Sequence, residues 1–109
     1  KILSMDKGDI NLAVNEFGNG RSVYISGLPY TPENVRILLR AIYFAASREE
    51  EMFNWYTSNC NTECAAYLEV GNVAVINNSD KEQETELYKD KNNIEKLTLK
   101  PYEIKWISK

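Results

Sequence analysis

The sequence contains no histidine, and this absence removes many catalytic and metal-binding chemistries. Histidine titrates closest to neutral pH and is the commonest metal ligand in proteins. Catalysis by this chain would therefore have to use carboxylates, tyrosines, lysines or the two cysteines. The sequence also lacks any apolar run near the roughly 20 residues that cross a bilayer, so we expect a soluble protein with no membrane partner.

The first residues lack the features of a secretory signal. The stretch KILSMDKGD has no basic start, apolar middle or small-residue exit, so no export information is expected in it. It also lacks an initiator methionine, which favours a fragment of a longer protein. A length of 109 residues suits one domain, or two pieces that share a core.

The chain has no surplus of basic residues. Thirteen basic and sixteen acidic residues give a net charge of -3, and lysines alternate with acidic residues in the C-terminal half. Binding to nucleic acid needs a concentrated basic face that neutralises phosphates. We therefore expect no nucleic-acid partner.

Only two cysteines are present, Cys60 and Cys64 in the sequence CNTEC. A zinc site would need two further ligands, and a disulfide would have to satisfy strict Cβ geometry. We favour a third interpretation, in which both are reduced thiols at the start of a strand in a cytoplasmic protein. A thiol sensor remains a weaker alternative.

The first half of the chain changes from a strand pattern to a helix pattern. Apolar residues alternate with polar ones in DINLAVNEF and again in RSVYI, which predicts a hairpin with a glycine-rich turn, and residues 2–5 are expected to add an edge strand. Thr31 is expected to cap a helix over residues 32–46, with Pro32 at its first position. A shorter helix is expected over about residues 48–56.

The predicted helix 32–46 is apolar around much of its circumference, with Arg36 and Arg40 as its main polar seam. Such a helix should be covered on more than one side. From residue 59 onward the pattern changes to short strand-like runs separated by turn residues, which predicts an antiparallel meander or sandwich. Pro101 is expected at a bend or a sheet edge.

Four features could be mistaken for sites. The corner SGLPYTPEN has one glycine and no basic residue, so we interpret it as a rigid strand-to-helix connection, with Tyr30 packing over the helix, and not as a phosphate loop. Glu49, Glu50 and Glu51 are consecutive and are expected to be a solvated cluster at a helix start. Arg21 is expected to have a backbone or carboxylate partner.

Aromatic residues are the fourth feature. They could form a sugar-stacking surface, but aromatics in small β domains more often fill cores and interfaces. The residues concerned are Trp55, Tyr56, Tyr67, Tyr88, Tyr102 and Trp106. We therefore predict no catalytic, cofactor-binding or metal-binding residue in this chain, and no cofactor.

Two long stretches resemble one enzyme family. LAVNEFGNGRSVYISGLPYTPENVRILLRAIYFAA resembles the end of the central amidotransferase-like α/β domain of the galacto-N-biose/lacto-N-biose phosphorylases, the 1,3-β-galactosyl-N-acetylhexosamine phosphorylases. YLEVGNVAVINNSDKEQETELYKDKNNIEKLTLKPYEIKW looks like their small C-terminal β domain. The resemblance covers nearly the whole chain from about Asp9.

The resemblance implies a fold and an activity. The implied fold is α+β, with the tail of the amidotransferase-like domain in residues 1–57 and a small antiparallel β-sandwich-like domain in residues 58–109. The implied parent is an inverting phosphorylase that converts a β-galactosyl disaccharide and phosphate to α-galactose 1-phosphate, using an acid located in a barrel domain outside this chain. Expected partners are the barrel and central domains of the parent and, in addition, a second copy in a homodimer.

The expected role of the chain is therefore architectural. A carbohydrate-binding or protein-interaction β module is the alternative from a different class. The acceptor sugar stays open between N-acetylhexosamine and rhamnose, because its contacts are expected outside this chain.

Overall fold

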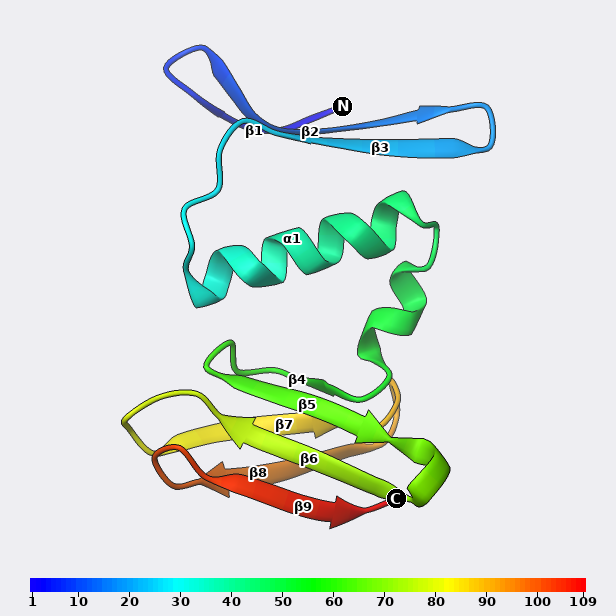
Figure 1. Ribbon diagram of the computed structural model, residues 1–109. Coiled ribbons are helices and arrows are strands. Elements are labelled where there is room, and N and C mark those ends of the chain that lie inside the picture. Colours follow the sequence, from blue (N-terminus) through cyan, green and yellow to red (C-terminus); the bar gives the residue numbers. More distant parts are fainter. The chain divides into compact units, whose positions relative to one another are not determined.

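Alternating apolar residues near the N-terminus form three antiparallel strands, which confirms the predicted hairpin and edge strand. The computed structural model describes residues 1–109 and contains β1 (Ile2–Asp6), β2 (Asp9–Phe17) and β3 (Gly20–Ile25). They form a sheet in the order β1-β2-β3 (Figure 1). Gly18, between β2 and β3, has a φ of 58°, a left-handed conformation that glycine adopts without a steric penalty.

The helix α1 (Pro32–Ala45) begins where the sequence predicts. The Thr31 side chain accepts a hydrogen bond of 3.1 Å from the backbone N–H of Asn34, and Pro32 occupies the first turn. A capping bond of this kind satisfies one of the N–H groups that have no partner within a helix. The prediction of both the helix and its cap is confirmed.

The second predicted helix, over residues 48–56, is wrong in type and length. A five-residue 3-10 helix, η1 (Glu49–Phe53), takes its place. Ser47 and Trp55 flank it with φ values of 57° and 58°, and an α-helix cannot continue through residues in that conformation. Residues 56 and 57 instead form the short strand β4 (Tyr56–Thr57).

The chain divides into two compact units, Lys1–Glu51 and Met52–Lys109. The second contains, after β4, the strands β5 (Thr62–Tyr67), β6 (Asn72–Asn77), β7 (Gln83–Tyr88), β8 (Ile94–Leu99) and β9 (Ile104–Ser108), and the 3-10 turn η2 (Leu68–Val70). They form two antiparallel three-stranded sheets, β4-β7-β8 and β5-β6-β9. Because β7 and β8 lie in one sheet and β6 and β9 in the other, the arrangement is a sandwich and not a plain meander.

The sandwich has a closed core to which both sheets contribute. Val73, Val75, Leu87 and Leu99 are each 0% exposed. Complete burial of one such side chain contributes about 1.5–3 kcal/mol relative to leaving it in water. This core is the main source of stability in residues 52–109.

A buried asparagine closes one end of the sandwich. The Asn77 side-chain amide donates hydrogen bonds to the backbone oxygens of Lys81 (2.7 Å) and Lys100 (3.0 Å), and its oxygen accepts one from the Ser79 N–H (2.9 Å). Pro101 lies in the turn that connects β8 to β9, so the predicted bend at this proline is confirmed.

None of the helices combines the length and apolar character that a bilayer crossing needs.

Candidate functional site

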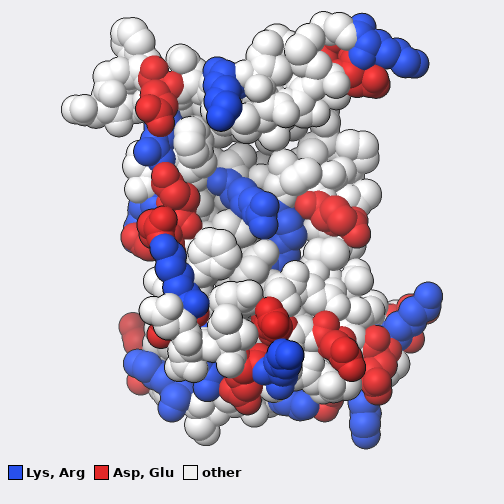
Figure 2. All heavy atoms as spheres, turned by 180° about the vertical axis from the view of Figure 1, so that it is seen from behind, with Lys and Arg blue, Asp and Glu red and all other residues white.

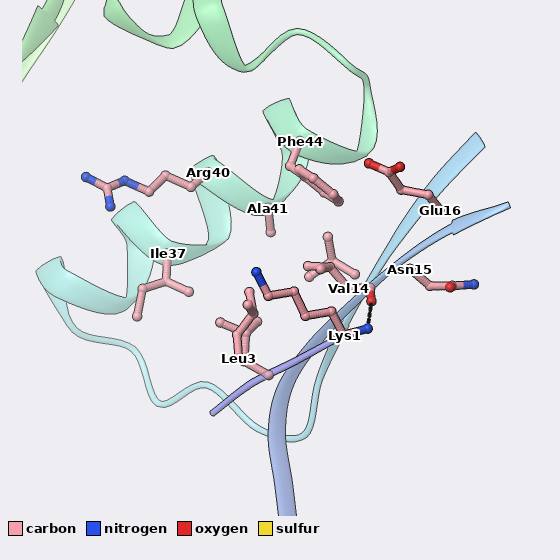
Figure 3. Close-up of a pocket in the computed structure, with 11 residues that line it drawn as sticks. Lys1, Leu3, Val14, Asn15, Glu16, Ile37, Arg40, Ala41 and Phe44 are labelled. Carbon is pink, nitrogen blue, oxygen red and sulfur yellow. Dashed lines mark hydrogen bonds between the residues drawn. The ribbon is translucent and has the colours of Figure 1, made fainter. Parts of the chain in front are cut away.

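A cavity lies within residues 1–51, between the β1-β2-β3 sheet and α1. Its volume is about 720 Å³. Figure 3 shows that the residues around it come from the strands on one side and from the helix on the other. Its lining residues are Lys1, Leu3, Leu12, Val14, Asn15, Glu16, Val23, Ile37, Arg40, Ala41 and Phe44.

The walls of this cavity are mainly apolar because the register aligns the apolar residues of the hairpin. Leu12 pairs with Ile25 and Val14 pairs with Val23 across β2 and β3. In Figure 3 Ala41 and Phe44 approach the strands, whereas the guanidinium of Arg40 points away from them. The N-terminal ammonium of Lys1 donates a hydrogen bond of 2.6 Å to the Val14 oxygen. The cavity therefore offers apolar surface and few polar groups to an occupant.

Arg21 fastens β3 to the end of α1 and to η1. One guanidinium nitrogen lies 2.6 Å from a Glu49 carboxylate oxygen, and the Nε atom lies 3.4 Å from Glu16. The guanidinium also stacks 4.8 Å from the centre of the Phe44 ring. The expected carboxylate partner of Arg21 is thus confirmed, whereas the contact with Phe44 was not anticipated.

Charge and hydrogen bonding around Arg21 shift two pKa values. The pKa of Glu49 is lowered, first by the hydrogen bond from its own backbone N–H and then by the one from Arg21. The pKa of Arg21 is raised, chiefly by its hydrogen bond to Glu49. Both shifts favour the charged forms of the two side chains. Glu49 is therefore held as a carboxylate, and not as a carboxylic acid that could donate a proton.

Two of the three consecutive glutamates, Glu49 and Glu51, have different ion-pair partners. Glu49 pairs with Arg21, while Glu51 accepts a hydrogen bond of 2.8 Å from the Nε atom of Arg48. All three lie exposed in η1, which confirms the predicted solvated cluster. A pair of carboxyl groups that cleaves a glycosidic bond must face the same bond from two sides, whereas Glu49 and Glu51 are each held in a separate ion pair with an arginine.

The corner SGLPYTPEN forms the connection from β3 to α1, as predicted. The backbone N–H of Asn34 donates its hydrogen bond to the Thr31 side chain, and the Asn34 side-chain amide donates one of 2.7 Å to the Pro29 backbone oxygen. The packing expected for Tyr30 is wrong, because this residue is 94% exposed. Its ring lies in the loop before the cap and has no neighbour to cover it.

The two cysteines lie in different surroundings. Cys60 is in the turn before β5, and Cys64 is within β5; both are half-buried and no disulfide joins them. Cys64 packs against the core, and burial raises the pKa of its thiol to about 11. Burial thus makes Cys64 less reactive than an ordinary thiol.

The aromatic residues of residues 52–109 lie in several separate places. Trp55 packs against the core, and Phe53, Tyr56 and Tyr88 form a cluster with ring centres 5.8–6.1 Å apart. Tyr67 and Trp106 form an exposed pair on the β5-β6-β9 sheet. The six aromatics predicted as a group are therefore not one surface, since Tyr102 is exposed in a turn elsewhere.

Another cavity, of about 420 Å³, lies on the β7-β8 hairpin and has a more polar lining. Its lining residues are Ser58, Glu84, Thr85, Glu86, Lys96, Leu97 and Thr98. Figure 2 shows acidic and basic side chains interspersed over the visible face, without a field of one sign. No group of three or more His, Cys, Asp or Glu side chains is placed to hold a metal ion.

Two family models match consecutive parts of the chain. Residues 1–50 match the lacto-N-biose phosphorylase central domain, and residues 55–107 match the lacto-N-biose phosphorylase C-terminal domain. The change from one match to the next falls close to the division between the two compact units, after Glu51.

Whole relatives are much longer than this chain. A 1,3-β-galactosyl-N-acetylhexosamine phosphorylase of Lachnoclostridium phytofermentans is 44% identical over 99% of the chain, which spans 15% of that relative. The enzyme of the same name from Bifidobacterium longum is 44% identical over 77% of the chain and 11% of its own length. A D-galactosyl-β-1→4-L-rhamnose phosphorylase of L. phytofermentans is 34% identical over 78% of the chain and 12% of its own length.

Proposed function

The chain belongs to the lacto-N-biose phosphorylase family, and we propose that it is the non-catalytic C-terminal portion of a longer phosphorylase. One observation carries this proposal. The chain matches the central and C-terminal domain models in succession, and 99% of the chain aligns with only 15% of a longer relative. The separate ion pairs of Glu49 and Glu51 support a role in which these two carboxylates transfer no proton.

The proposed reaction takes place in the parent and not in this chain. Phosphate attacks the anomeric carbon of a β-galactosyl-N-acetylhexosamine disaccharide, the bond from that carbon to the bridging oxygen breaks, and a carboxylic acid of the parent protonates the departing oxygen. The products are α-galactose 1-phosphate and the free acceptor sugar. We propose N-acetylhexosamine as the acceptor, with rhamnose as the alternative.

The proposed role of residues 1–51 is to complete a larger amidotransferase-like domain. The helix α1 has no buried residue, and Leu38 and Ile42 are 47% and 57% exposed. Apolar helix positions exposed to this degree indicate a surface that another part of the protein covers. The proposed partners are the barrel and central domains of the parent, and we also propose a homodimer. The proposed location is the cytoplasm, where thiols such as Cys60 stay reduced.

An activity assay on two polypeptides tests the proposal. The 109-residue chain and the longer parent polypeptide are incubated with phosphate and a β-galactosyl-N-acetylhexosamine disaccharide, and α-galactose 1-phosphate is measured. We expect release by the parent alone. Release by the 109-residue chain at a rate proportional to its concentration would overturn the proposal.

One substitution made in both polypeptides tests the architectural role. Leu38→Gln keeps a good helix former and removes an apolar surface group, so we expect a small change in the melting temperature of the 109-residue chain. In the parent, where we propose that Leu38 is covered, the same substitution should lower the melting temperature by several degrees. An equal effect in the two polypeptides would contradict coverage of this helix face.

A further inference from the structure

We propose that Tyr67 and Trp106, which we call the aromatic platform, bind the ring of a galactosyl sugar on the outer face of the β5-β6-β9 sheet. The ligand class rests on the proposed function, because the parent would handle β-galactosyl disaccharides. The platform itself rests on the geometry of the two rings, and it would be a sugar site separate from the reaction centre.

The two rings lean toward each other over a strand with a small side chain. Tyr67 is on β5 and Trp106 is on β9, with β6 between them. Two strand spacings amount to roughly 10 Å, yet the ring centres are 6.1 Å apart. Trp106 is paired with Ala74 of β6, whose small side chain leaves space above the strand for the rings.

Both rings of the platform are accessible to solvent. Their side chains are 53% and 63% exposed, and their planes differ by 35°. The half-buried rings of Phe53 and Tyr56 instead have an interplanar angle of 70°, the edge-to-face arrangement in which two aromatic rings pack favourably against each other. The platform therefore presents aromatic surface to a ligand and the other cluster does not.

Uncharged polar groups lie beside the platform. Asn72 is paired with Tyr67 on one side and with Ser108 on the other, and both Asn72 and Ser108 are exposed. An amide and a hydroxyl can exchange hydrogen bonds with sugar hydroxyls. A neutral ligand with one apolar face and a polar edge fits this combination.

A galactosyl ring has this combination of properties. Its axial 4-hydroxyl points to one side and leaves the hydrogens on C3, C4 and C5 together on the other, which forms an apolar face that can stack on an aromatic ring. An apolar protein partner is the competing occupant, because Ile104 on the same sheet is 56% exposed. Ring stacking would use Tyr67 and Trp106, whereas a protein contact would bury Ile104 as well.

Titration of the 109-residue chain with methyl β-D-galactopyranoside tests the platform. The indole N–H resonance of Trp106 is followed by NMR, while that of Trp55, which packs against the core, reports on the fold. We expect saturable binding with a dissociation constant on the order of 1 mM. Tyr67→Ala, followed by the same Trp106 resonance, should weaken binding by about 10-fold or more, as expected for loss of a stacked ring. Trp106→Ala lacks that resonance, so its binding is followed by saturation-transfer NMR on the sugar, as is that of the unsubstituted chain for comparison, and should weaken by a similar factor.

Two control variants separate stacking from general apolar contact. Tyr102→Ala removes an equally exposed ring outside the platform and should leave the dissociation constant unchanged. Ile104→Ala should also have no effect, and a loss as large as that of Trp106→Ala would favour an apolar protein partner and overturn the proposal. A flat titration of the unsubstituted chain, or an equal response to methyl β-D-glucopyranoside, would overturn it too.

The outcome is distinguishable from a failure of the proposed function. Phosphorolysis is measured on the parent polypeptide, and sugar binding is measured on the 109-residue chain. An inactive parent with a saturable Trp106 response would refute the proposed reaction and support the platform. An active parent with a flat titration would do the opposite.

Discussion

The two units of the chain reach very different degrees of burial with similar apolar content along their strands. None of residues 1–51 is buried, and a cavity of about 720 Å³ separates the sheet from the helix. In residues 52–109 four aliphatic side chains are 0% exposed in a single cluster. An apolar pattern in the sequence therefore does not by itself produce a core, which also requires facing layers that fill the space between them.

The difference indicates where folding stability originates. Dispersion and hydrophobic contributions scale with surface removed from water and with the closeness of packing. The closed sandwich supplies both, whereas in residues 1–51 the ion pair of Arg21 and Glu49 supplements a loosely packed interface. This contrast between the units can be tested at Leu87, at Cys64 and at the Arg21–Glu49 pair.

The largest effect is expected from Leu87→Ala, which removes a fully buried side chain from the sandwich. The lost contacts and the resulting cavity should lower the free energy of unfolding by about 2–5 kcal/mol, measured by denaturant titration. Leu38→Ala in α1, where the side chain is 47% exposed, is the matched control and should cost about 1 kcal/mol or less. Equal costs would remove the contrast between the units.

The second prediction compares thiol reactivity. Because burial raises the pKa of Cys64 from 9.0 to about 11, its thiolate fraction at about pH 8 should be roughly 100-fold below that of an ordinary thiol. Alkylation of a Cys60→Ser variant, followed by mass spectrometry, measures this rate. A thiol placed in the open cavity by Ala41→Cys, with both native cysteines replaced by serine, should react much faster. Rapid modification of Cys64 would support the thiol-sensor alternative.

The smallest effect concerns the pH dependence of the Arg21–Glu49 pair. The pKa of Glu49 is lower in the folded chain than its usual 4.5, so the pair stabilises the fold above that pH and this contribution is lost as the pH falls through the lowered pKa. Arg21→Gln should raise the Glu49 pKa partway toward its usual value, because the hydrogen bond from its own backbone remains. NMR titration measures this shift, and Glu51, which pairs with Arg48, serves as the internal control.

The parts of the fold that depend on neighbouring residues could be predicted from the sequence. Thr31, Pro32 and the apolar spacing after them specify the start of α1 within a few residues, and the alternation in β2 and β3 specifies their hairpin. The family resemblance based on the motifs agrees with both domain models.

The parts that depend on distant residues could not be predicted. β4 is a strand because Tyr56 and Thr57 pair with Tyr88 and Leu87 of β7, and no local signal indicates that pairing. Arg21 and Glu49 are 28 residues apart in sequence, so their ion pair becomes visible only in the structure. The cavity depends on the distance between the sheet and the helix, which residue patterns do not specify.

The strand β3 has a hydrogen-bonding neighbour on one side only, β2. Its other side is a row of backbone groups onto which a further strand can be added, from the same polypeptide or from another molecule. The same row that would let a longer protein extend this sheet exposes the 109-residue chain to self-association as its concentration rises. The same unpaired backbone groups of β3 therefore favour assembly of a longer protein and aggregation of the short chain.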